Sequence, residues 1–161
     1  MSAAAVLELN DIQYIVLARA PAVTGRYEFL SFRDAAAGRA WLAGILDRVP
    51  SVEQVRKSAK EDQRWISVAF TWNGLRALGL DEASLATFPE EFRQGMASRA
   101  DILGDDGTHH PQHCRDGLAT DKVHAIAVLF ARDSKERERC VGEHRALVDR
   151  CDGGEVLSHL D

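Results

Sequence analysis

The segment from Gly104 to Lys122 carries the densest group of side chains that could do chemistry in this sequence. Imidazole, thiolate and carboxylate groups are the ligands that transition metals prefer. Their spacing matches no zinc signature, and adjacent histidines seldom share one metal, so we favour a solvated polar loop over a metal site. The candidate metal ligands are His109, His110 and His113, with Cys114, Asp105, Asp106 and Asp116 nearby.

The other three histidines fall on predicted secondary structure. His144 lies on the apolar face of a predicted helix, and His124 and His159 lie on predicted strands. A histidine in such a place is more often a hydrogen-bonded core residue than a metal ligand. We therefore expect structural roles for all three.

The cysteine pattern indicates a reducing compartment. Three cysteines form no C-x-x-C pair, which argues against a disulfide scaffold. Cys140 and Cys151 share one predicted helical stripe, which would hold them about 16 Å apart, too far for a disulfide. Cys114 lies in the loop, where it could be exposed and reactive.

Length and composition favour one globular domain over residues 1–161. The chain is 45% hydrophobic and 28% charged, which rules out wholesale disorder. Its net charge of −5 disfavours nucleic acid and anionic membrane surfaces as partners. No run approaches the ~18 apolar residues of a membrane span, and the start does not read as a signal peptide. We expect a cytoplasmic location.

The first half of the sequence predicts several strands and one helix. Alternating residues predict strands at 12–18 and 26–33, and Asp34 caps a predicted amphipathic helix that reaches about Arg48. A weaker strand at 52–59 is expected to form a hairpin with a strand at 65–72.

The second half predicts short helices, a loop, and a strand–helix–strand ending. Asn73 and a capping box of Thr87 with Glu90 predict two short helices, the second reaching Arg99. The strand at 123–132 is apolar on both faces, Asp133 caps the last helix, and 156–160 forms the closing strand. The predicted fold is α+β, a ferredoxin-like split β-α-β (βαββαβ) domain with a helical insertion between the third and fourth core strands.

One stretch of the insertion could line a pocket. Phe92, Met96 and Arg99 fall near one face of a predicted helix, and Arg93 flanks them. These four residues are the candidate cofactor-binding residues, although core packing would produce the same pattern.

Four stretches carry a resemblance to a known family. They are LELNDIQ (7–13), the strand-to-helix junction from Arg26 to Leu42, VAFTWNGLRALGL (68–80) and FPEEFRQGM (88–96), of which the last two are the most specific. Together they resemble the amino-terminal half of the dye-decolourising (DyP-type) haem peroxidases, over most of the chain. Tyr14 stands where the family usually has a glycine after Ile-Gln.

The resemblance implies two ferredoxin-like halves packed through their sheets, with haem held mainly by the second half. In the family, an Asp of a Gly-x-x-Asp-Gly motif and an Arg assist cleavage of hydrogen peroxide, and a proximal His binds the iron. Those motifs would follow the closing strand, so no catalytic position carries over to residues of this sequence. We expect this chain to bind no haem by itself.

A similar pattern occurs earlier, from His113 to Gly117. It has histidine in place of the first glycine and precedes the strand at 123–132 rather than following the closing strand, so we regard the match as accidental. Arg115 and Asp116 remain the candidate residues for proton-transfer chemistry.

Three functions stay open at this point. The chain could be a non-catalytic DyP-type half that pairs through its sheet, or a haem-dependent peroxidase completed by dimerisation or by a separate second half. It could also be a dimeric ferredoxin-like binding module. Two helices cover only one face of a sheet, so we predict a homodimer that hides about 800 Å² per partner on the other face.

Overall fold

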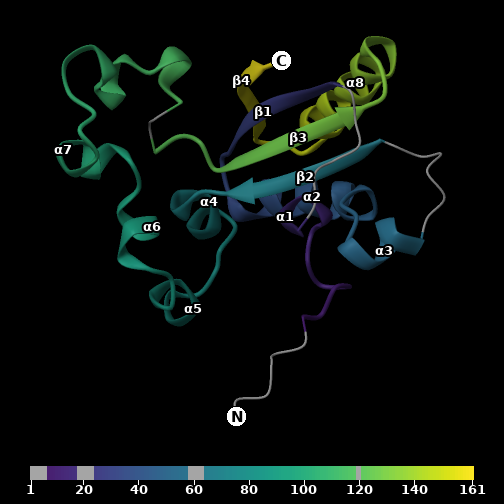
Figure 1. Ribbon diagram of the computed structural model, residues 1–161, viewed down its shortest axis with the longest axis horizontal. Helices are drawn as coiled ribbons and strands as arrows, with labels where there is room; N and C mark the ends of the chain where they lie inside the picture. Colours follow the sequence, from purple (N-terminus) through teal and green to yellow (C-terminus); the bar gives the residue numbers. More distant parts are fainter. Residues whose placement is uncertain (1–6, 18–23, 58–63, 119–120) are drawn as a thin grey trace.

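A four-stranded antiparallel sheet forms the centre of the computed structural model, which describes residues 7–17, 24–57, 64–118 and 121–161 (Figure 1). The strand order is β2-β3-β1-β4, and every neighbouring pair is antiparallel. This is the ferredoxin-like arrangement, and the predicted α+β fold class is confirmed. The core elements are β1 (Thr24–Phe32), α2 (Ala35–Ile45), β2 (Trp65–Phe70), β3 (Ala125–Ala131), α8 (Ser134–Arg150) and β4 (Gly154–Leu160).

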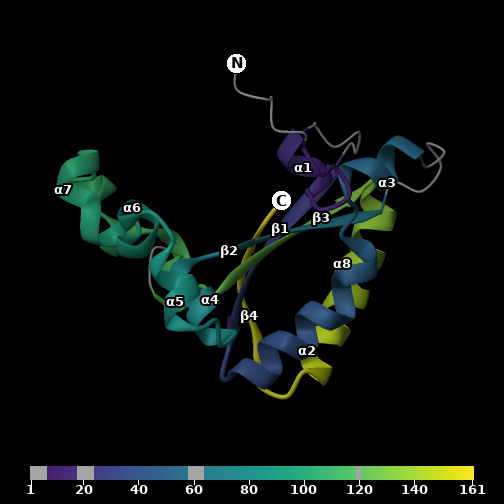
Figure 2. The same ribbon diagram turned by 90° about the horizontal axis from the view of Figure 1, so that it is seen from below.

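Helices α2 and α8 lie together on one side of the sheet (Figure 2). Each begins at the predicted cap. The Asp34 carboxylate accepts a hydrogen bond from the Ala37 N–H at 3.0 Å, and the Asp133 carboxylate accepts one from the Glu136 N–H at 2.8 Å. Such caps satisfy amides that the first helical turn leaves unpaired. The 3-10 turn η1 (Leu46–Arg48) continues α2.

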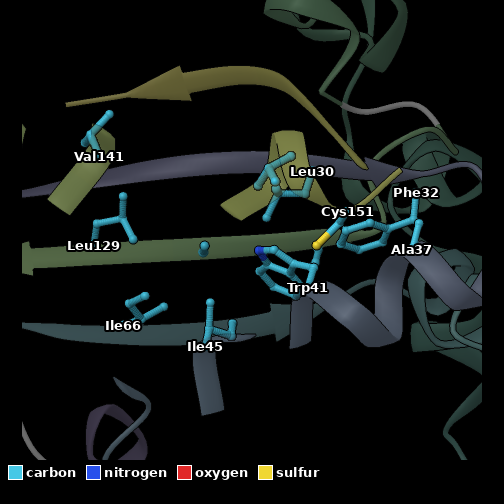
Figure 3. Close-up of a cluster of buried hydrophobic side chains, with 12 residues drawn as sticks. Leu30, Phe32, Ala37, Trp41, Ile45, Ile66, Leu129, Val141 and Cys151 are labelled. Atoms are coloured by element: carbon cyan, nitrogen blue, oxygen red, sulfur yellow. The ribbon is translucent and has the colours of Figure 1, made fainter. Parts of the chain in front are cut away.

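The hydrophobic core fills the space between these helices and the sheet (Figure 3). Trp41 of α2 and Leu30 of β1 have no exposed surface, and the β3 side chains at alternate positions point into the same layer. The predicted stripe of the last helix is confirmed, because its core-facing members are buried. The predicted stripe consists of Cys140, Val141, His144, Leu147, Val148 and Cys151, of which all are buried except Leu147, which is half-buried against the core.

Two predicted strands are wrong. The segments at 12–18 and 52–59 contain helices α1 (Tyr14–Leu17) and α3 (Val52–Lys57), so there is no hairpin between 52–59 and β2; residues 18, 58 and 59 lie outside the described part. The missed signal is a capping box, in which Ser51 Oγ accepts from the Gln54 N–H at 3.2 Å while the Ser51 N–H donates to Gln54 Oε1 at 2.7 Å. As a result, the helical insertion lies between the second and third strands of the sheet, not the third and fourth.

The insertion between β2 and β3 is a chain of short helices on the other side of the sheet from α2 and α8 (Figure 2). Thr71 caps the first of them in place of the predicted Asn73, and Thr87 closes a helix rather than opening one. The predicted loop 104–122 contains only short 3-10 turns in its described part. The elements are α4 (Trp72–Ala77), α5 (Glu82–Ala86), α6 (Glu90–Gln94), η2 (Ala97–Arg99), α7 (Ala100–Leu103), η3 (Gly107–His109), η4 (Pro111–His113) and η5 (Arg115–Gly117).

The two ends of the insertion are joined at a narrow neck. Thr71 Oγ1 donates to the Val123 carbonyl at 2.6 Å, and the Thr71 N–H donates to the His124 carbonyl at 3.1 Å. Gly74 lies so close that a Cβ there would sit 1.7 Å from the His124 oxygen. Only glycine allows this approach of helix to strand.

Gln13 blocks the outer edge of β2. Its side-chain amide donates to the Val68 carbonyl and accepts from the Val68 N–H, both at 3.0 Å. An exposed strand edge offers unpaired backbone groups to other strands, and a side chain that pairs with both groups of one residue prevents this locally. Gln13 is the last residue of the LELNDIQ stretch, so part of the family resemblance has a structural reason.

Candidate functional site

The sheet presents an open face on the side away from α2 and α8. Alternation along β1 and β3 places apolar side chains there, and Tyr27 and Leu160 keep 47% and 38% of their surface exposed. The prediction that β3 is apolar on both sides is confirmed, because its outward residues are aliphatic or aromatic and only half-buried. The open face consists of Tyr27, Phe29, Ile126, Val128, Phe130 and Leu160.

A cavity of about 510 Å³ lies between one end of the open face and the insertion. Phe29 and Ile126 contribute from the sheet, and Leu118 and Val123 from the segment that returns to β3. We call it the insertion cavity. The four residues predicted to line a pocket, Phe92, Arg93, Met96 and Arg99, all line this cavity. A role for them in cofactor binding stays a prediction.

An aromatic cluster supports the wall of the insertion cavity. Trp72 of α4 contacts Phe88 and Phe92 edge to face, with ring centroids 6.3 and 6.5 Å apart, and the two phenylalanine rings lie 5.2 Å apart. Such arrangements are the favourable ones for aromatic pairs. The cluster packs α6 against α4, so the Phe92 side of the cavity wall is held in place.

The covered face of the sheet holds a buried polar network that the sequence did not reveal. Trp41 Nε1 donates to His144 Nε2 at 2.9 Å, so the histidine carries its proton on Nδ1, which donates to Glu28 Oε2 at 2.6 Å. The other Glu28 oxygen accepts from Arg145 Nε at 2.8 Å. His144 therefore has the structural role expected for it.

The environment of Glu28 sets its charge. Burial raises the pKa of this carboxyl, but the hydrogen bonds from His144 and Arg145 outweigh burial and hold the pKa below its ordinary value. The group stays ionised at neutral pH although it has no exposed surface. A buried carboxylate of this kind is stable only while its partners remain in place.

The histidines of the loop are neither among the residues that line the insertion cavity nor part of the buried polar network. His109 and His113 are exposed, and His110 Nδ1 accepts from the Gln112 N–H at 3.2 Å. Within the described ranges, no three His, Cys, Asp or Glu side chains gather closely enough to hold a metal ion. Cys114 is exposed and lines the insertion cavity, while Cys140 and Cys151 are buried, and all three are free thiols.

Asp116, which also pairs with Arg115, connects the loop to the edge strand β4. Asp116 Oδ2 accepts from Ser158 Oγ of β4 at 2.6 Å and from Arg115 Nε at 3.1 Å. The hydrogen bond from Ser158 lowers the pKa of Asp116, desolvation opposes this shift, and the nearby Arg115 lowers the pKa further. Asp116 also has a φ of +55°, which L-residues rarely adopt. Proton-transfer chemistry at this pair stays a prediction.

Helices of the described segments include none that is long and apolar enough to cross a membrane. The longest, α8, has 17 residues.

A four-stranded antiparallel sheet of this strand order, with two helices over one face, defines the class of ferredoxin-like domains. A sequence profile described as the DyP dimeric alpha+beta barrel domain matches residues 11–150. The chain belongs to this DyP family, as its sequence motifs predicted.

Known proteins show the same relationship over part of their length. Peroxidase 2 of Mycetinis scorodonius is 35% identical over 103 residues, which is 63% of this chain and 20% of that protein. A decolorizing peroxidase from Auricularia auricula-judae superposes with a TM-score of 0.79 at 20% identity, over 96% of this chain and 33% of that one. An ancestral D-type dye decolorizing peroxidase superposes with a TM-score of 0.78 at 23% identity, over 97% of this chain and 35% of that one. The chain thus spans about one third of the solved relatives.

The described residues do not fit the haem that the family binds. No histidine of the described chain lines the insertion cavity, and both nitrogens of His144 are committed to Trp41 and Glu28. His124 Nδ1 accepts from the Phe32 N–H at 2.9 Å, and burial lowers the pKa of this imidazole. Axial ligation by a histidine of this chain would need one of these bonds to break or an exposed loop residue to move.

Proposed function

We propose that this chain is a non-catalytic DyP-type amino-terminal half, a single unit whose open face packs against a second ferredoxin-like sheet. The exposed apolar face of the sheet carries this proposal. Tyr27 on β1 lies beside Leu160 of the edge strand β4, and the apolar residues of β3 lie on the other side of Tyr27. A second sheet would remove this surface from water, which the two helices cannot do.

A second copy of the chain is the partner that we propose for the isolated protein. The family's description as a dimeric barrel supports packing through the sheet, and the chain corresponds to one third of the solved peroxidase chains. A standard interface hides about 800 Å² on each side, and one face of a four-stranded sheet is of that order. Three free cysteines support a cytoplasmic setting.

Catalysis would require more than this chain. The described histidines are committed or exposed, so haem would be held by a partner that supplies the iron ligand. The alternative function is a peroxidase completed by dimerisation or by a separate second half, which would oxidise dyes or phenolic compounds with hydrogen peroxide. A dimeric ferredoxin-like binding module is the third possibility and needs no haem at all.

Light scattering at micromolar concentrations tests the pairing. We expect a mass near twice 17.8 kDa for the wild-type chain and near 17.8 kDa for Tyr27→Lys, because a charge would be buried in the interface. The matched control is Leu46→Lys, which places the same charge at an exposed residue on the helical side. A wild-type monomer at all concentrations, or equal loss of dimer in both variants, would contradict sheet-to-sheet pairing.

Haem titration separates the first function from the second. We expect the absorption spectrum of free haem in the presence of the chain. A shifted Soret band that disappears in Tyr27→Lys would instead support a peroxidase completed by dimerisation.

A further inference from the structure

We infer that the insertion cavity is a binding site for a small amphipathic carboxylate, with Arg99 as its anion-binding residue. This inference concerns the isolated chain and does not rest on the pairing of the open face. The cavity volume of about 510 Å³ falls in the range of pockets that hold small organic molecules.

The walls of the cavity favour an apolar ligand body. Phe29 and Ile126 form one side, and Phe92 and Met96 form the other. Phe92 is fixed by the aromatic cluster with Trp72, while Met96 is 68% exposed and can adapt to a ligand. A flat ring or a branched alkyl group would replace water on these surfaces.

The polar groups of the cavity favour one negative charge. Arg99 is half-buried, and within the described ranges its guanidinium has neither a hydrogen bond nor an ion pair; the same holds for the half-buried amide of Asn73. A guanidinium keeps its charge at all ordinary pH values, so a half-buried one without an anion gains from a carboxylate. Among the described residues Arg93 also has no hydrogen-bond or ion-pair partner, but this side chain is exposed.

The acidic residues of the lining restrict the charge of the ligand and do not themselves bind its carboxylate. Glu91 and Asp121 are both exposed and form no ion pair with Arg99. They would repel a second negative charge, so the site fits a monocarboxylate better than a dicarboxylate or a phosphate ester.

A pair of probes of the same shape tests the charge requirement. We would titrate the wild-type chain with 1-naphthaleneacetate and with the neutral 1-naphthaleneacetamide by calorimetry. The acid should bind about tenfold more tightly or better, the range of a charge-assisted hydrogen bond. Equal binding of the two probes would overturn the assignment of an anion, and no binding of either would overturn the site.

Two arginine variants test which residue carries the recognition. Arg99→Gln should weaken binding of the acid by about tenfold and leave binding of the amide within about twofold. Arg76→Gln removes an exposed arginine of α4 outside the cavity and should change neither. Unchanged acid binding in Arg99→Gln, or equal loss in both variants, would contradict the inference.

Protein concentration tests the competing occupant. Should a side chain of a partner sheet fill the cavity, the affinity for the acid would fall as dimers form. Such a fall would overturn the inference, whereas an affinity independent of dimer formation would support it.

Discussion

The two faces of the sheet are built from the same strands but differ in how far their side chains are buried. The covered face buries Trp41, Leu30 and the Glu28 carboxylate under α2 and α8, with both Glu28 oxygens and both His144 nitrogens paired. The open face has half-buried apolar residues, and Tyr27 keeps nearly half of its surface in water. One face therefore holds the fold together, and the other is available for association.

The difference shows why the polar groups are placed as they are. A buried carboxylate costs several kcal/mol unless its partners are fixed, so Glu28 restricts how α8 and α2 can pack on β1. The open face, which we propose to meet another sheet, would gain nothing from such a fixed charge. Its aromatic and aliphatic residues can pack against many surfaces, with backbone register supplied by the strands below them.

The largest expected effect is the loss of Trp41. Trp41→Ala removes a side chain with no exposed surface and leaves His144 Nε2 without its donor, so we expect the free energy of unfolding to fall by about 3–5 kcal/mol. Tyr27→Ala on the open face is the matched control and should cost about 1 kcal/mol or less in a monomer. Urea unfolding of both variants measures the contrast, and equal losses would remove the distinction between the faces.

Glu28→Gln is expected to lower the free energy of unfolding by less than Trp41→Ala does, and by an amount that depends on pH. The folded-state pKa of Glu28 lies below its unfolded value, so its ionised form stabilises the fold above the unfolded pKa, and this contribution is lost as the pH falls through the folded pKa. We expect the variant to be about 2 kcal/mol less stable than wild type at pH 7, with the gap narrowing in acid.

Urea titrations from pH 7 down to pH 3 would measure that gap. Glu155→Gln changes an exposed carboxylate on β4 and serves as the control, with no gap expected at any pH. A constant gap between wild type and Glu28→Gln over the whole range would mean that the charge of Glu28 is not what stabilises the network.

The smallest effect on stability is expected at the sheet edge. Gln13→Ala leaves both backbone groups of Val68 without the side-chain partner, so we expect a loss of about 1 kcal/mol and concentration-dependent association through β2. Sedimentation velocity together with urea unfolding measures both. Asn10→Ala, an exposed change in the same segment, should show neither effect.

The sequence predicted the parts of the fold that repeat a local pattern. Alternation at 26–33 and 123–132 and the caps at Asp34 and Asp133 were correct because each follows from a few neighbouring residues. The strand predicted at 52–59 was wrong because a short apolar pattern does not separate a strand from a one-turn helix, and the Ser51–Gln54 capping box decided the outcome.

Contacts between distant residues could not be predicted in this way. Glu28 pairs with His144 across 116 positions and Gln13 with Val68 across 55, and neither spacing carries a local signal. The residues of the insertion cavity were different, because Phe92, Arg93, Met96 and Arg99 share one short stretch. Their grouping was visible in the sequence, whereas the sheet residues opposite them were not.

Because of the neck between Thr71 and His124, the insertion could be replaced without changing the sheet. β2 and β3 are antiparallel neighbours, and the chain that leaves one re-enters the other at the same point, so a short turn could join the two strands without changing their register. Natural or engineered relatives could therefore carry insertions of very different length and sequence on an unchanged sheet. The wall that the insertion gives to the cavity would then vary, while the wall formed by Phe29 and Ile126 of the open face would stay the same.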